Sequence, residues 1–177
     1  MAVSMFEVSD DRPSTNASTP KWMAFILLLV GIVLAHGVVP WASSLLTRRY
    51  GWTEGSPGIS NFLGLIPVVA GAGGLIWIVV AGLAETRRVE LTVFPNHLLM
   101  RGPYGFTRNP MYSAELALWL GWALWYGSVA VFSGFVVFWA AVNFVVVPWE
   151  ERSLETRFGE TYREYKASKP RWFRTLC

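Results

Sequence analysis

The stretch WMAFILLLVGIVLAHGVVPWASSLL, residues 22–46, decides the class of fold. It carries no Asp, Glu, Lys or Arg, and neither does the stretch at residues 59–84. A helix needs about 20 such residues to cross the hydrocarbon core of a bilayer. The sequence therefore predicts two membrane-spanning helices, at residues 22–46 and 59–84.

A third uncharged stretch, residues 116–149, is too long for one span. Tyr126, Gly127 and Ser128 interrupt it where an antiparallel helix pair would turn. We predict spans at residues 110–126 and 129–148, which form a tight hairpin. Because the helix before the turn is short for a full crossing, a shallow re-entrant hairpin stays open as an alternative.

The fold class that follows is all-α: an integral-membrane helical bundle of about four transmembrane helices with a C-terminal amphipathic surface helix. Residues 1–20 are rich in Ser, Thr, Asp and Pro and predict a mobile polar tail, whereas residues 21–177 predict a single membrane domain. The chain has one cysteine and two histidines, so neither a disulfide framework nor a haem or zinc site is expected. No basic face alternates with aromatic residues, so nucleic acid is not an expected partner.

Positive charge marks one side of the predicted bundle. The loops predicted on the other side hold only Arg48 and Arg49. By the positive-inside rule, both termini and the polar loops that carry the candidate site face the cytoplasm. The basic residues on that side are Arg12, Lys21, Arg87, Arg88, Arg101, Arg108, Arg152, Arg157, Arg163, Lys166, Lys169, Arg171 and Arg174.

The predicted cytosolic loop, residues 85–109, leads into a helix through the sequence RGPYGFTRNPMYSAEL, residues 101–116. Asn109 and Pro110 are typical of a helix start, with Asn as the N-cap and Pro at the first helical position. Glu115 then lies just inside the membrane boundary, where an acidic side chain is costly and a functional role is the default interpretation. Four residues recur at helical spacing and share its face: Tyr112, Glu115, Trp119 and Trp122.

A structural role for Glu115 is the alternative. The positive end of the helix favours carboxylates, and Arg108 is close enough in sequence to pair with it. The tryptophans on the same face fit an interfacial aromatic belt. His36, alone in the first span, is predicted to be hydrogen-bonded to a neighbouring helix rather than to bind a ligand.

The second polar segment, residues 149–177, is predicted to be a cytosolic helix. It follows Pro148, which is predicted to end the last span, and it begins with the adjacent carboxylates of Glu150 and Glu151. Apolar side chains predict an amphipathic helix on the membrane surface over the mouth of the bundle: Leu154, Phe158, Tyr162 and Tyr165. The charges on its other face are predicted to be solvated: Arg157, Glu160, Arg163 and Lys166.

Two motifs together carry a family resemblance. RGPYGFTRNPMY, followed one helical hairpin later by EERSLETRFGETYREYK and PRW, resembles the C-terminal half of the isoprenylcysteine carboxyl methyltransferase and phospholipid methyltransferase superfamily. The resemblance covers about residues 96–173, whereas the first two predicted spans resemble only generic helices. It implies an integral-membrane methyltransferase that uses S-adenosylmethionine.

The resemblance also implies which residues contact the cofactor. The segment before the Gly-Pro-Tyr turn supplies Asn96, His97, Leu98 and Leu99, and the turn supplies Tyr104. The Arg-His-Pro-x-Tyr motif of the family corresponds to Arg108, Asn109, Pro110, Met111 and Tyr112, with Asn in place of His. The family's Glu pair corresponds to Glu150 and Glu151, and the first is expected to accept hydrogen bonds from the cofactor.

A second departure from the family concerns the methyl acceptor. The carboxyl methyltransferases have an arginine one turn before the Glu pair, whereas this chain has Val146. A prenylcysteine carboxylate would lose its counter-charge there. The acceptor is therefore predicted to be a lipophilic molecule from the bilayer, and a phospholipid amine or another small lipophilic acceptor fits at least as well as a carboxylate.

The chemistry of the cofactor agrees with these residue types. Its sulfonium favours aromatic faces, its carboxylate needs an arginine or a helix N-terminus, and its amine and hydroxyls need acceptors. Because methyl transfer is a direct displacement, most of the catalysis comes from positioning and exclusion of water. We predict Glu115 as the base, with Arg108 and Tyr112 as the other catalytic residues. The alternative is a non-enzymatic membrane protein whose glutamates form structural ion pairs with Arg101 and Arg108.

Overall fold

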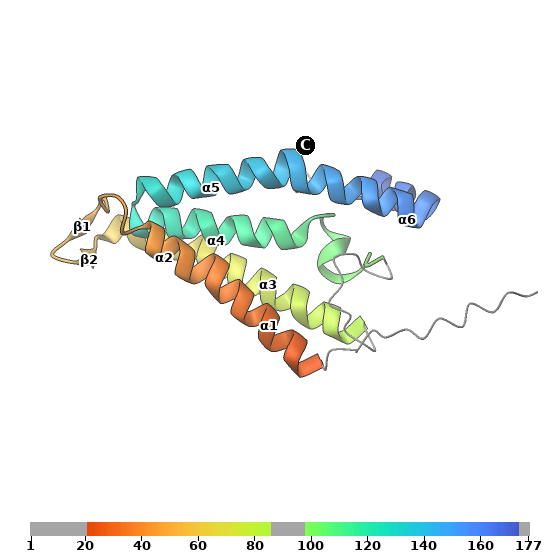
Figure 1. Cartoon of the computed structure of the whole chain (residues 1–177), viewed down its shortest axis with the longest axis horizontal. Coiled ribbons are helices and arrows are strands. Elements are labelled where there is room, and N and C mark those ends of the chain that lie inside the picture. The colour runs from red at the N-terminus through yellow and green to blue at the C-terminus, as the bar shows by residue number, and fades with distance from the viewer. Residues whose placement is uncertain (1–20, 86–97, 174–177) are drawn as a thin grey trace, which may run out of the picture.

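The computed structural model describes residues 21–85 and 98–173, and over these residues it forms four long helical rods that lie side by side (Figure 1). The first rod is α1 (Lys21–Val33), a π-helical turn (Leu34–Val38) and α2 (Val39–Ser43); the second is a 3₁₀ helix (Ile59–Gly64) and α3 (Leu65–Glu85); the third is α4 (Pro110–Tyr126); the fourth is α5 (Val129–Ala141), a π-helical turn (Val142–Val146) and α6 (Val147–Ser168). The mostly helical prediction is confirmed.

Two of the rods are long and apolar enough to cross a membrane. They contain the helices Ile59–Gly82 and Val129–Ser168, and the first rod contains a shorter apolar helix, Leu29–Ser43. Large apolar side chains cover the outside of the rods; Val69 and Val137, for example, are each more than two-thirds exposed. An apolar outer surface of this kind suits lipid rather than water.

The third rod packs closely against the second. A Cβ atom added at Gly64 would come within 2.5 Å of the Gly121 carbonyl oxygen, and one added at Gly71 would come within 2.5 Å of the Ala114 carbonyl oxygen. Small residues let helix backbones approach in this way where lipid surrounds them. A cluster of buried side chains continues the contact and includes Leu75 and Leu118.

The fourth rod continues through Pro148, so the prediction that Pro148 ends the last span is wrong. A proline ring inside a helix clashes with the carbonyl four residues earlier. Here a π-helical turn precedes it, in which the Val147 N–H donates to the Val142 carbonyl, five residues back. The wider turn leaves room for the ring. The same device precedes Pro40 in the first rod.

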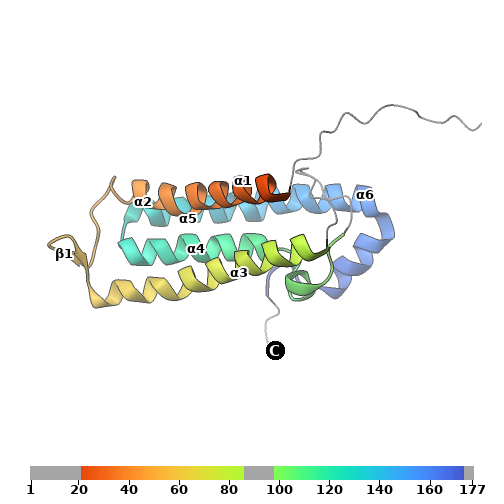
Figure 2. The ribbon, with the colours of Figure 1, turned by 90° about the horizontal axis from the view of Figure 1, so that it is seen from below.

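The predicted surface helix is not a separate element. α6 continues the fourth rod, bends at Gly159 and ends at Ser168, so the predicted helix over residues 149–177 is wrong in its start and its end. Gly159 has φ 54° and ψ −125°, a conformation almost exclusive to glycine. After the bend, the last arm of α6 turns back beneath the bundle (Figure 2).

The opposite end of the bundle holds the predicted turn between the last two rods. α4 ends at Tyr126, Gly127 follows with φ 56°, and the Ser128 hydroxyl accepts a hydrogen bond from the Val131 N–H to cap α5. A short hairpin of β1 (Trp52–Thr53) and β2 (Ser56–Pro57) lies at this end, so the structure is not all-α in this detail. Sequence periodicity does not register strands of two residues.

Candidate active site

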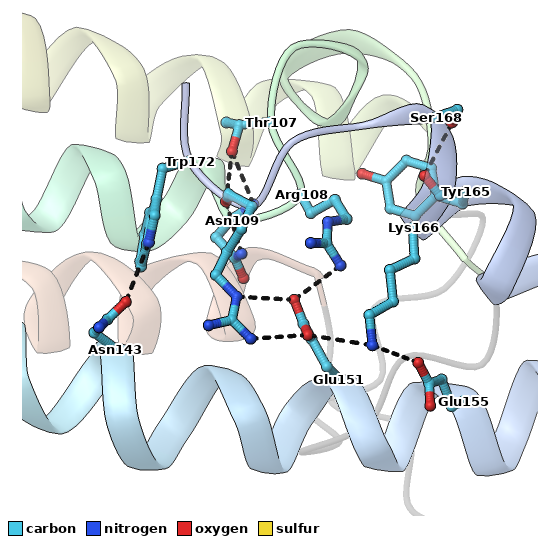
Figure 3. Close-up of polar contacts among 11 residues, drawn as sticks. Thr107, Arg108, Asn109, Asn143, Glu151, Glu155, Tyr165, Lys166, Ser168 and Trp172 are labelled. Atoms are coloured by element: carbon cyan, nitrogen blue, oxygen red, sulfur yellow. Dashed lines mark hydrogen bonds and ion pairs between the residues drawn. The ribbon is translucent and has the colours of Figure 1, made fainter. Parts of the chain in front are cut away.

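The loop before α4 is held in place by the far end of the chain. α4 begins at Pro110 as predicted, but the Asn109 side chain does not cap it. Instead, the Asn109 amide donates to the Arg171 carbonyl at 2.9 Å, and the Thr107 hydroxyl donates to the same oxygen at 2.9 Å. The Arg108 N–H donates to the Pro170 carbonyl at 3.0 Å. The segment after α6 therefore crosses the loop directly (Figure 3).

A buried carboxylate fixes this crossing electrostatically. Glu151 is 5% exposed and lies 2.9 Å from Arg108 Nη1, 3.1 Å from Arg171 Nη2 and 3.5 Å from Lys166 Nζ (Figure 3). Burial alone raises the pKa of Glu151, but hydrogen bonds from Arg171 and the charge of Arg108 hold this pKa below its usual value. We call Glu151, Arg108, Arg171 and Lys166 the Glu151 cluster.

The cluster corrects two predictions. Arg108 pairs with Glu151 and not with Glu115. Lys166, predicted to be solvated, contacts both Glu151 and Glu155. Arg171 was missed as a site residue altogether, although the PRW motif that contains it was part of the family resemblance. Glu160 and Arg163, by contrast, form an exposed pair on the outer face, as predicted.

Glu150 has a different environment, although it is the next residue. In the polar part of α6, beyond the apolar residues that end at Trp149, it accepts a hydrogen bond of 3.0 Å from the Tyr112 hydroxyl. Burial raises the pKa of Glu150, and the Tyr112 hydrogen bond offsets part of this effect. Burial, together with the negative charge of Glu150, also raises the pKa of Tyr104 to about 12, so this phenol stays protonated at neutral pH.

These groups line a pocket of about 490 Å³, its open mouth included. The pocket brings together seven of the predicted site residues: Leu98, Leu99, Tyr104, Arg108, Asn109, Glu150 and Glu151. Its other walls are Leu154, Tyr162 and Tyr165, which were predicted only as the apolar face of a surface helix. The bend at Gly159 turns the two tyrosines inward, and the Tyr165 hydroxyl donates to the Tyr104 carbonyl at 2.8 Å.

The remaining predicted site residues lie around this pocket or outside the described part of the chain. Tyr112 reaches the pocket through its hydrogen bond to Glu150. Pro110 is buried, and Met111 is 38% exposed; neither lines the wall. Asn96 and His97 lie outside the residues that the structure describes.

Glu115 meets the first rod rather than the loop. Its Oε1 lies 3.6 Å from His36 Nε2, and both side chains are largely buried. The predicted link of His36 to a neighbouring helix is thus made in two ways: its imidazole contacts Glu115, and its backbone carbonyl accepts a hydrogen bond from the Trp122 indole.

The described residues form a bundle of apolar helices with a polar pocket at one end. The sequence pattern of the phospholipid methyltransferase family matches residues 59–161, more than half of the chain, and the protein belongs to this family. It is therefore an S-adenosylmethionine-dependent methyltransferase. Its two long apolar helices and its family together indicate an integral membrane protein.

The family match also corrects one prediction. It includes the second rod, so the prediction that this span resembles only generic helices is wrong.

One further relative was found by sequence. A stretch of 62 residues is 37% identical to an uncharacterized protein of Haemophilus influenzae, and it covers 35% of this chain and 98% of that protein. No solved structure matches the chain.

The residues of the pocket fit the cofactor of the family. Arg108 Nε is buried without a hydrogen-bond partner among residues 21–85 and 98–173, and it belongs to a side chain that lines the pocket. A buried donor of this kind suits the carboxylate of S-adenosylmethionine. The Glu150 carboxylate has lone pairs left for the amine and hydroxyls of the cofactor.

Proposed function

We propose that the protein transfers the methyl group of S-adenosylmethionine to the amine headgroup of a membrane lipid. The observation that supports this most directly is the joining of a polar, tyrosine-walled pocket to the end of an apolar bundle. A cofactor reaches such a pocket from water, and a lipid reaches it from the bilayer between the rods.

The cofactor is held, on this proposal, by three kinds of group. Arg108 donates to the carboxylate, Glu150 accepts from the amine and ribose hydroxyls, and Tyr104 with the two leucines covers the adenosine. When bound, S-adenosylmethionine supplies a methyl group on a positively charged sulfur. The chain contributes orientation and exclusion of water, because the bent arm of α6 closes one side of the pocket.

An amine acceptor is favoured over a carboxylate by the charges near the pocket. Val146 stands where the carboxyl methyltransferases have an arginine, and Glu115 lies one helical turn beyond Tyr112 on α4. The Glu115 carboxylate would repel an acceptor that is itself a carboxylate. It would attract an ammonium, and it can accept the proton that an amine loses. We propose Glu115 as that base.

The proposed membrane placement puts four crossings in the bilayer and both termini in the cytoplasm. The loop before α4 and the charged arm of α6 lie at one end of the bundle, and β1 and β2 lie at the other (Figure 1). The positive-inside rule supports a cytoplasmic location for the pocket end.

Calorimetric titration with S-adenosylhomocysteine tests the cofactor site. We expect saturable binding to the detergent-purified full chain, at least tenfold weaker binding to Glu150→Gln, and unchanged binding to the control Glu160→Gln, whose side chain is exposed. Equal affinity of wild type and Glu150→Gln would contradict the assigned role of Glu150.

Transfer of labelled methyl groups into vesicles tests the acceptor. Phosphatidylethanolamine in a phosphatidylcholine background should accept label, and vesicles with phosphatidylglycerol in its place should not. Label in neither lipid, from protein that binds S-adenosylhomocysteine, would refute the amine headgroup and leave the cofactor site intact.

A further inference from the structure

A buried ionisable pair joins the first rod, which lies outside the part of the chain that matches the family, to α4, which lies within it. His36 lies before residue 59, where the family match begins, whereas Glu115 lies within it. The two side chains are 10% and 13% exposed, with His36 Nε2 and Glu115 Oε1 3.6 Å apart. Burying two ionisable groups costs free energy unless they compensate each other, so the pair needs an explanation.

The backbone around His36 directs its imidazole at Glu115. His36 is the middle residue of the π-helical turn Leu34–Val38, an element often found at functional sites. Its carbonyl accepts a hydrogen bond from the Trp122 indole, which docks the turn on α4. The other ring nitrogen, Nδ1, is buried and has no hydrogen-bond partner within the described residues. A purely structural histidine would ordinarily satisfy both nitrogens.

Tyr112 lies on α4 between this pair and the pocket. Glu115 follows Tyr112 by three residues on the same face of α4. The Tyr112 hydroxyl donates to Glu150, which lines the pocket. The titratable groups along this route are His36 from the first rod, Glu115 and Tyr112 from α4, and Glu150 from α6. α5 places the Phe138 ring 6.1 Å from the imidazole.

We infer that His36 is a positioning residue for methyl transfer: the contact with its imidazole orients the Glu115 side chain on the face of α4 that also carries Tyr112. The inference rests on the proposed amine methylation. In that reaction the amine nitrogen forms a bond to the methyl carbon as the bond between sulfur and carbon breaks, and the sulfur keeps the electron pair. The resulting ammonium loses one proton to Glu115, and the electrons of the broken N–H bond stay on nitrogen.

A split between turnover and cofactor affinity separates this role from a structural one. In His36→Gln the Glu115 side chain loses the imidazole that orients it, so the base is no longer held in its productive position. We expect kcat to fall about 10- to 100-fold. Affinity for S-adenosylhomocysteine should stay within twofold of wild type.

Trp122→Phe is the matched control. It removes the hydrogen bond to the His36 carbonyl and leaves the imidazole in place. We expect wild-type kcat from it. Wild-type kcat from His36→Gln, or an equal loss of kcat in both variants, would overturn the inference.

A spectroscopic measurement tests the pair without turnover. The chain has two histidines, His36 and His97, so ring signals from ¹⁵N-histidine are assigned with a single variant. We expect Glu115→Gln to shift the ring ¹⁵N signals of His36 and to leave those of His97 unchanged, because the variant changes the group that faces the imidazole. Unchanged His36 signals would overturn the inference, whereas wild-type protein that does not bind S-adenosylhomocysteine would instead refute the proposed function.

Discussion

At the scale of single residues, the two adjacent glutamates of the family motif have different partners. Both line the pocket, but Glu150 accepts one hydrogen bond from a hydroxyl, whereas Glu151 is enclosed by three cations. The sequence predicts both as a cofactor-binding pair, because a motif records residue types and not the side of the helix that each residue faces. Successive residues on a helix point about 100° apart, so the two carboxylates have different neighbours.

The stability of the protein should depend on Glu151 more than on Glu150. Glu151→Gln leaves Arg108, whose side chain is 10% exposed, without its counter-charge, and breaking a buried pair in this way costs about 3–5 kcal/mol. Glu150→Gln keeps a partner for the Tyr112 hydroxyl. Thermal unfolding in detergent should therefore show a much larger decrease for Glu151→Gln. Equal decreases would show that the Glu151 cluster contributes no special stability.

Acid should weaken the same cluster. Because the folded-state pKa of Glu151 lies below the unfolded value of about 4.3, its ion pairs stabilise the protein above that pH, and the contribution is lost as pH falls through the folded-state pKa. Unfolding midpoints measured from pH 7 down to pH 3 should fall more steeply below about pH 4.5 for wild type than for Glu151→Gln. Parallel curves for the two proteins would contradict the assignment.

At the scale of elements, the bend in α6 makes the pocket. Without it, Tyr162 and Tyr165 would continue along the fourth rod and away from the loop. The apolar spacing predicts which residues share a face, but it does not predict a break, since Gly159 interrupts the helix by its backbone conformation alone. The two π-helical turns escape prediction for a similar reason, because proline in a sequence usually indicates that a helix ends.

Gly159→Ala should therefore weaken cofactor binding. A side chain at φ 54° is strained by about 1–3 kcal/mol, and a straighter α6 relieves the strain by removing two walls of the pocket. Gly55→Ala is the control, because Gly55 has φ 80° in the hairpin at the other end of the bundle and, like Gly159, has no atom within 4 Å of an added Cβ. Calorimetry should show weaker S-adenosylhomocysteine binding for Gly159→Ala and wild-type affinity for Gly55→Ala; similar affinities for both variants would contradict the role of the bend.

At the scale of the whole molecule, the sequence predicts the helical bundle and the hairpin of the last two rods well. Long uncharged stretches are typical of helices that cross a bilayer, and Gly127 with Ser128 is typical of a turn. The prediction fails where segments distant in sequence meet. Arg171 reaches Glu151 and Asn109 only after α6 has bent back, and nothing local to Arg171 records that approach.

The proposed orientation can be tested with the one cysteine of the chain, Cys177. A membrane-impermeant maleimide should label it in inside-out vesicles and not in intact cells. Ser56→Cys in a Cys177→Ser background, placed in the hairpin at the other end, should show the opposite pattern. Labelling of both sites from one side would refute the proposed crossings.

The close contacts of Gly64 and Gly71 with α4 limit where the helices of the bundle can separate. At these contacts backbone rests on backbone, so no side chain can swing aside to open a passage. The first and fourth rods instead each contain a π-helical turn, where the hydrogen-bond register is already interrupted. On the proposed function, a lipid that enters sideways would therefore pass between the first and fourth rods, next to the imidazole that contacts Glu115.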